Sequence, residues 1–260
     1  MPPRRLLLLS NSVLHCPQEA KKSSEPWLEW CWPNIEDFLG PVIKVLFIPF
    51  APLTSWDEAT ERLQNVMKTR GNSYQVTGIH QCKSMKDAIA ETEAIMVSGG
   101  NTFRLLYELQ KNDLIDAIRQ RVLNDGIPYI GWSAGTNVAT PNIKTTNDMP
   151  IIWPGKDAAL NLFPYNINPH FTRFTMKGFA GETRVQRLEE CFRLNKQPIV
   201  LLPEGTGIKV DGDKLQFFRG PCINDPVEVM KGTPNEEKPQ YIEYKFDHPT
   251  SEWINIDIFK

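Results

Sequence analysis

The chain has 260 residues, of which 41% are hydrophobic and 23% charged, and its formal net charge is -2. This balance is typical of a globular protein with a core large enough to exclude water from a catalytic cleft, so we expect a single domain over residues 1–260. Lysine and arginine are dispersed along the chain, which argues against binding to nucleic acid or to an anionic membrane surface.

The N-terminal residues predict a buried strand. The apolar run 6–9 follows two arginines, as in a signal peptide, but it is too short for one and is followed by polar residues. No segment approaches the ~20 apolar residues that span a bilayer. Five cysteines are scattered without a CxxC pair or a disulfide framework, so we expect free thiols and a cytoplasmic protein.

From residue 42 to residue 135, apolar strand patterns alternate with amphipathic helix patterns. This repeated β-α-β order predicts a mainly parallel sheet with helices on both faces, and ligands bind such sheets beyond the carboxyl ends of the strands. We expect strands at 42–49, 74–79, 94–97 and 127–130, and helices at 56–70, 84–92, 103–109 and 114–122.

The second half of the chain has fewer regular patterns. Residues 140–181 are rich in proline, asparagine and glycine, which predicts a long irregular segment of the kind that carries function. Turn signals separate the short apolar runs that follow, so we expect hairpins near the C-terminus. The expected elements are a helix at 182–194, a strand at 198–202, hairpins from 206, a linker at 232–240, and strands at 241–246 and 253–259.

The sequence Gly131-Trp132-Ser133-Ala134-Gly135 follows the predicted strand 127–130 and is typical of a nucleophile elbow. In this tight turn between strand and helix, flanking glycines are needed because a side chain would collide with neighbouring backbone. The pattern alone is weak, since it is expected by chance in about one chain of this length in ten. The assignment of Ser133 as a nucleophile therefore depends on other residues.

A serine hydroxyl needs a base, and His170 is the histidine that lies in an expected active-site loop. An imidazole base in turn needs a carboxylate that fixes its tautomer. Asp148 and Glu204 are both candidates: Asp148 lies between serine and histidine in the chain, and Glu204 follows the predicted strand 198–202. An ordinary role in a turn is open for each acid, and the sequence does not rank them.

Acyl transfer also needs N–H donors directed at the developing oxyanion. The amide of Ala134, directly after the nucleophile, is one candidate, and Gly99 or Gly100 after the strand 94–97 offers a second. The same loop, Ser98 to Thr102, lacks the lysine of a phosphate-binding P-loop and the spacing of a dinucleotide fingerprint. We therefore expect no nucleotide cofactor.

Six short motifs follow one another along the chain: VSGGNTF at 97–103, GWSAG at 131–135, TTNDMP at 145–150, NPHF at 168–171, GETR at 181–184 and LPEG at 202–205. Six motifs in register are more specific than any one of them. Together they resemble the aspartyl dipeptidase (peptidase E) family of serine peptidases, and their order and spacing cover residues 42–221.

The resemblance implies a flavodoxin-like three-layer α/β sandwich related to the class I glutamine amidotransferases, here with a short β-rich C-terminal part. It also implies a serine exopeptidase that hydrolyses dipeptides with an N-terminal aspartate, with a small acidic dipeptide as its partner and no metal or organic cofactor. At matching positions the family places a nucleophile at Ser133, a base at His170, acids at Asp148 and Glu204, and at Arg184 a guanidinium that receives the aspartyl carboxylate.

Two stretches depart from the family. Residues 15–40 lack an expected glycine-rich stretch and carry a tryptophan-rich run, 27–32, while residues 226–260 form a C-terminal extension to which we assign no role. Because of the first departure, an alternative function is that of a catalytically impaired homologue that binds an acidic ligand or partner. A related serine hydrolase acting on aspartyl polymers or isoaspartyl bonds is the alternative within the enzyme class. The oligomeric state does not follow from the sequence.

Overall fold

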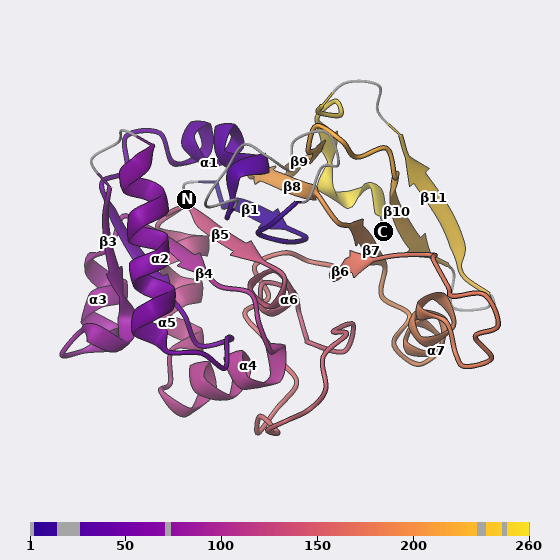
Figure 1. Cartoon of the computed structure of the whole chain (residues 1–260), viewed down its shortest axis with the longest axis horizontal. Coiled ribbons are helices and arrows are strands. Elements are labelled where there is room, and N and C mark those ends of the chain that lie inside the picture. Colours follow the sequence, from indigo (N-terminus) through magenta and orange to yellow (C-terminus); the bar gives the residue numbers. More distant parts are fainter. Residues whose placement is uncertain (1–2, 15–26, 71–73, 233–237, 246–248, 260) are drawn as a thin grey trace.

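The computed structural model describes residues 3–14, 27–70, 74–232, 238–245 and 249–259. Its strands form two sheets, which Figure 1 shows side by side. The elements are β1 (Arg5–Leu9), α1 (Trp32–Leu39), β2 (Lys44–Ile48), α2 (Trp56–Thr69), β3 (Gln75–Gly78), α3 (Met85–Glu91), β4 (Ala94–Val97), α4 (Thr102–Lys111), α5 (Ile115–Arg119), β5 (Tyr129–Trp132), α6 (Ala134–Val138), β6 (Asn166–Phe171), α7 (Arg184–Asn195), β7 (Ile199–Pro203), β8 (Thr206–Asp211), β9 (Lys214–Arg219), β10 (Val227–Lys231), β11 (Gln240–Tyr244) and β12 (Ile254–Asn255).

The larger sheet has eight strands in the order β12-β9-β8-β1-β5-β4-β2-β3. The five strands from β1 to β3 in this order are parallel, whereas β8, β9 and β12 extend the sheet in antiparallel fashion. The predicted α/β class with a mainly parallel central sheet is therefore confirmed.

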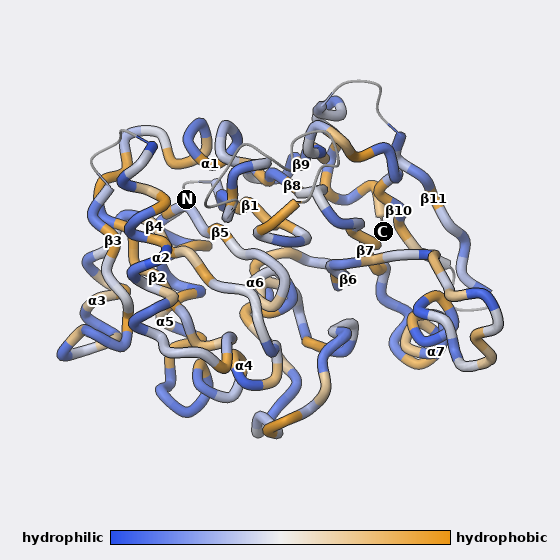
Figure 2. Tube along the Cα trace, in the orientation of Figure 1, coloured by the Kyte–Doolittle hydropathy of each residue, from blue (hydrophilic) through white to orange (hydrophobic). Residues whose placement is uncertain are grey.

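Alternate residues of the central strands pack on opposite faces of this sheet, as the two-residue period of a strand requires. Val45 and Phe47 of β2 join a core with α1 and α2, while Leu46 and Ile48 join a core with α3 to α6. Helices thus cover both faces, which gives the three layers. Figure 2 shows hydrophobic and hydrophilic residues alternating along these helices, as amphipathic helices require.

The smaller sheet has the order β11-β10-β7-β6, and its β6 corrects the prediction that residues 140–181 lack regular structure. β6 runs parallel to β7. A strand that is buried almost throughout is expected to show a continuous apolar run, and β6 shows none because Asn166 and Asn168 are buried polar residues. The side chain of Asn168 donates to the carbonyl oxygen of Thr145 at 2.8 Å and to Oδ1 of Asn147 at 2.7 Å.

Two further expectations need correction. The predicted strand 253–259 is a strand only at β12 and continues as the 3-10 turn Ile256–Phe259. The turn brings the side chains of both Ile256 and Phe259 into the core. Cys31, Cys82 and Cys191 are free thiols as expected, but Cys222 is disulfide-bonded. Cys16, most of the predicted linker 232–240 and part of the atypical stretch 15–40 lie outside the described residues. Within the described part, no helix has the length and apolar character needed to cross a membrane.

The C-terminal extension contributes β10 and β11 to the smaller sheet. Glu228 of β10 is buried and forms a two-point ion pair with Arg173, which lies just beyond β6. The Arg173 guanidinium also lies over the rings of Phe171 and Tyr241, at 5.7 and 5.0 Å from their centroids. The extension therefore anchors the end of β6.

We expect Arg173→Met to lower the free energy of unfolding by about 1–3 kcal/mol, because it leaves the buried carboxylate of Glu228 without its partner. The loss is limited because the Arg173 side chain is half exposed and its charge is screened by water. Chemical denaturation of the single variant and of Arg173→Met/Glu228→Leu checks this. The double variant should recover much of the loss, and a double variant that is no more stable than the single one contradicts the expectation.

Candidate active site

Ser133 lies in a sharp turn between β5 and α6, with φ 54° and ψ -111°, a conformation that residues with a side chain rarely adopt. The two flanking glycines make this turn possible. A Cβ atom on Gly131 would lie 2.5 Å from the carbonyl oxygen of Gly135, and one on Gly135 would lie 2.3 Å from the carbonyl oxygen of Val97. The local backbone is thus that of a nucleophile elbow at the carboxyl end of a central parallel strand.

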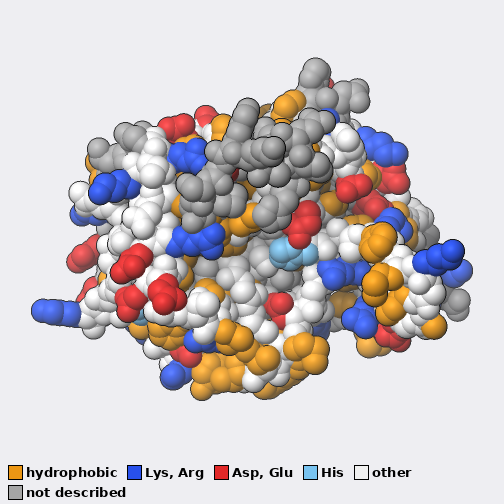
Figure 3. Space-filling model, viewed as in Figure 1, with side chains coloured by type: hydrophobic (Ala, Val, Ile, Leu, Met, Phe, Trp, Pro, Cys, Tyr) orange, Lys and Arg blue, Asp and Glu red, His pale blue; other side chains and the backbone are white. Residues whose placement is uncertain are grey.

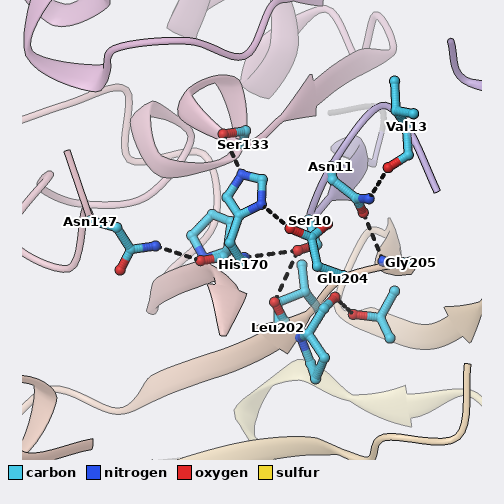
Figure 4. Close-up of polar contacts among 12 residues, drawn as sticks. Ser10, Asn11, Val13, Ser133, Asn147, His170, Leu202, Glu204 and Gly205 are labelled. Carbon is cyan, nitrogen blue, oxygen red and sulfur yellow. Dashed lines mark hydrogen bonds and ion pairs between the residues drawn. The ribbon is translucent and has the colours of Figure 1, made fainter. Parts of the chain in front are cut away.

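His170 faces Ser133 from the smaller sheet. Its φ of 55° coincides with a shift of register between Pro169 and Phe171 in the pairing of β6 with β7. Such irregularities re-aim a side chain, and here the imidazole turns toward the elbow. Nε2 of His170 lies 2.7 Å from the Oγ of Ser133. Figure 4 draws this contact as a dashed line.

Glu204 occupies the two-residue turn between β7 and β8, and its Oε1 lies 2.5 Å from Nδ1 of His170. The next residue, Gly205, has φ 69° and donates its N–H to Oδ1 of Asn11 at 2.7 Å. These contacts fix the turn. A proton on Nδ1 donated to the carboxylate leaves Nε2 free to accept the hydrogen of the serine hydroxyl.

Asp148 does not contact His170 in the described structure. Its Oδ2 instead accepts the N–H of Thr102 at 2.7 Å, at the start of α4, and the hydroxyl of Thr146 at 3.0 Å. The N–H groups of a first helical turn favour a carboxylate, which explains this placement. Of the two predicted acids, only Glu204 is brought to the imidazole.

Of the three predicted oxyanion donors, Ala134 directly follows Ser133, and Gly99 and Gly100 line the same cleft as Ser133. A Cβ atom on Gly99 would lie 3.0 Å from the Cβ of Ser133, so the loop after β4 packs against the elbow. Gly100 has φ 139°, and a Cβ there would lie 2.5 Å from the backbone of Ala51. Among the described residues, the amides of Gly99, Gly100 and Ala134 form no hydrogen bond, so each has a donor to offer.

Arg184 is the first residue of α7, and its Nη1 donates to the carbonyl oxygen of His170 at 2.7 Å. Burial, followed by the charge of Arg187, lowers the pKa of Arg184 from its ordinary value, while Glu204 acts in the opposite direction. The guanidinium lines a cavity of 310 Å³ that residues 172–187 form beside the site. The structure therefore places this predicted substrate-binding arginine next to the base.

A larger cleft of 540 Å³ contains the elbow, and Figure 3 views this face of the molecule with a histidine exposed near its centre. Its lining includes residues that the sequence did not indicate as functional. Some lie on α2, and others follow β1 or begin the tryptophan-rich run. These residues are Asn11, Ser12, Val13, Trp27, Glu58, Ala59 and Arg62.

Two polar residues directly after β1 support the site, and sequence reasoning missed both. The Ser10 hydroxyl accepts the N–H of His170 at 2.9 Å and donates to the carbonyl oxygen of Leu202 at 3.0 Å. Asn11 holds Gly205, as described above, and its Nδ2 donates to the carbonyl oxygen of Val13 at 2.6 Å. The sequence signal that could have identified them is their position, because polar residues directly after the carboxyl end of a buried parallel strand lie at the edge of the sheet where ligands bind.

Asn147 supports the site from the other side of the imidazole. Its Nδ2 donates to the carbonyl oxygen of Pro169 at 2.8 Å, and its Oδ1 accepts the side-chain amide of Asn168. The segment 145–148, which was expected to supply an acid, therefore positions the backbone on which His170 lies.

A serine in a strand–turn–helix elbow, hydrogen-bonded to an imidazole that contacts a carboxylate, is the arrangement that activates the nucleophile of a serine hydrolase. A family model described as Peptidase family S51 matches residues 6–218. The chain belongs to this family, and the predicted resemblance is confirmed.

Curated relatives and a solved structure agree with this assignment. The chain is 42% identical to a peptidase E of Nostoc sp. over 241 residues, which cover 92% of this chain and 93% of the relative. It is 46% identical to a peptidase E of Salmonella arizonae over 207 residues, covering 79% and 86%. The crystal structure of a peptidase from an acI-B1 actinobacterium superposes with a TM-score of 0.64 at 17% identity, covering 98% and 97%, and shares the fold.

Proposed function

We propose that this peptidase is a serine exopeptidase that hydrolyses dipeptides with an N-terminal aspartate. The observation that carries the proposal is the continuous contact from Ser133 through His170 to Glu204 at the elbow. The relatives named peptidase E support the peptidase class, and the aspartyl specificity rests on the resemblance and on Arg184.

In the proposed reaction, the Oγ of Ser133 attacks the carbonyl carbon of the aspartyl residue while Nε2 of His170 takes its proton. The amides of Ala134 and of Gly99 or Gly100 stabilise the oxyanion. The peptide C–N bond then breaks, and His170 returns the proton to the departing amine. Water, deprotonated by His170, hydrolyses the acyl-enzyme and releases aspartate. Glu204 stabilises the imidazolium in both halves of the reaction.

Incubation with Asp-Leu, Gly-Leu and isoaspartyl-leucine tests the proposal, with product release followed by chromatography. We expect cleavage of Asp-Leu alone. Cleavage of the isoaspartyl dipeptide instead would support the related hydrolase. Absence of turnover by folded protein would support an acidic-ligand-binding homologue, although the complete Ser133–His170–Glu204 contacts favour an active enzyme.

In the proposal Arg184 binds the aspartyl side chain, because a guanidinium can hold a carboxylate through two parallel hydrogen bonds. We expect Arg184→Gln to lower kcat/KM for Asp-Leu by about 100-fold, the loss typical of an unpaired charge in a closed site. The matched control is Arg193→Gln, in the last turn of α7, because this arginine is exposed and lines neither cavity; it should stay within about threefold of the wild type. An unchanged kcat/KM in Arg184→Gln would remove this residue from the substrate site.

A cytoplasmic location also stays a prediction.

A further inference from the structure

A second arginine lies in the catalytic cleft. Arg62, on α2, lines the 540 Å³ cleft together with Ser133, His170 and Glu204. Its guanidinium carbon lies 4.8 Å from the centroid of the Trp27 ring. Trp27 in turn packs edge-on against Trp132, the residue before the nucleophile, with ring centroids 5.4 Å apart. The two rings therefore hold a positive charge at one wall of the cleft that contains the elbow.

This arginine and Arg184 belong to different sides of the site. Figure 1 shows α2 and α7, which carry them, on opposite sides of the turn between β5 and α6. Arg184 lines the 310 Å³ cavity formed by residues 172–187, whereas Arg62 lines the cleft between α2 and the elbow. A substrate that crosses Ser133 therefore meets a guanidinium group on each side of the nucleophile.

An Asp-Xaa dipeptide has the matching charges. One carboxylate is the side chain of the acyl half, the other is the free C-terminus of the leaving half, and the scissile bond lies between them. If Arg184 holds the acyl half, the leaving half extends into the cleft toward α2. Glu58 faces the same cleft and repels a carboxylate near it, so the favourable position for the C-terminus is at Arg62 and Trp27.

We propose that Arg62 binds the free C-terminal carboxylate of the leaving residue and thereby restricts substrates to dipeptides. This inference rests on the proposed hydrolysis of Asp-Xaa dipeptides. A longer peptide carries its carboxylate at least one residue further away, about 3.5 Å in an extended chain, and presents an uncharged peptide group to Arg62. The arginine thus selects both the charge and the length of the leaving half.

The test compares Asp-Leu, Asp-Leu amide and Asp-Leu-Leu as substrates of the wild type, Arg62→Gln and Arg62→Lys. We expect the wild type to prefer Asp-Leu over the amide by about 10- to 100-fold in kcat/KM, the range of one charged hydrogen-bonded contact. Arg62→Gln should lose this preference, with Asp-Leu falling to the level of the amide and the amide unchanged within about twofold. Arg62→Lys should recover part of the preference, since it keeps the charge but not the planar fork.

Lys68→Gln is the matched control, because it removes one positive charge from an exposed position of α2 that does not line the cleft. It should behave as the wild type. An equal loss for Asp-Leu and its amide in Arg62→Gln would overturn the inference, as would an unchanged preference for the free acid.

Binding to Ser133→Ala protein, measured by calorimetry, separates this inference from the proposed reaction. Tighter binding of Asp-Leu than of its amide, abolished by adding Arg62→Gln, supports the carboxylate site even if the wild type cleaves neither compound. Equal binding of the two compounds contradicts it even if the wild type is an active aspartyl dipeptidase.

Discussion

Ser133→Ala is expected to lower kcat for Asp-Leu by at least about 10⁴-fold, because no other group of the site can form the acyl-enzyme and the remaining oxyanion donors supply only residual catalysis. Alanine keeps the Cβ atom at the strained φ of 54°, so the turn and its hydrogen bonds should stay intact. The variant therefore isolates the hydroxyl.

Single-turnover kinetics and mass spectrometry check this expectation. A serine-directed organophosphorus reagent should add the mass of one phosphoryl group to the wild type and no mass to Ser133→Ala. The thermal unfolding midpoints of the two proteins should agree within a few degrees. Residual turnover near the wild-type rate would show that Ser133 is not the nucleophile, and the proposed mechanism would fail.

The second large effect is expected at Glu204. Glu204→Gln should lower kcat by about 100- to 1,000-fold, since the amide can no longer stabilise the imidazolium and its NH₂ group can favour the wrong tautomer. The loss is smaller than for a buried triad acid because the Glu204 side chain is 52% exposed and partly screened by water. KM should change little, because Glu204 acts on the base.

Asp148→Asn is the matched comparison, since it removes the other predicted acid. It should leave kcat within about fivefold of the wild type and lower the free energy of unfolding by about 1 kcal/mol, as expected for a carboxylate that accepts the first N–H groups of a helix. Steady-state kinetics and denaturation of both variants decide the assignment. A larger loss of kcat in Asp148→Asn than in Glu204→Gln would reverse it.

The parallel half of the larger sheet was predictable because its strands are buried on both faces. Buried parallel strands such as β4 appear as short continuous apolar runs, and the helices between them show a regular apolar stripe. The same logic fails for β6, whose asparagines satisfy buried hydrogen bonds instead of showing a hydrophobic pattern. The backbone that carries His170 was therefore expected to be irregular.

The local features of the site were also readable in the sequence. Glycines at 131 and 135 are required by contacts within the elbow and with the adjacent strand, so the GWSAG pattern reflects local sterics. The contribution of Arg62 was not readable, because an exposed arginine on an amphipathic helix has the same pattern whether it faces solvent or a cleft. Its position depends on Trp27 and Trp132, which come together only in the fold.

The sequence by itself determined the α/β class, the family, and the identity of the serine and histidine that meet in the site, because these depend on short-range patterns and on motifs in register. The tertiary structure alone decided which carboxylate contacts the imidazole and which arginine lines the catalytic cleft. The physical reason is that Glu204 reaches His170 through the pairing of β6 with β7 and a turn held by Asn11, whereas Asp148 is held at the start of α4. Glu204 lies 34 residues from His170, and Asn11 lies 194 residues from Gly205, so these contacts are set by packing and leave no local signal.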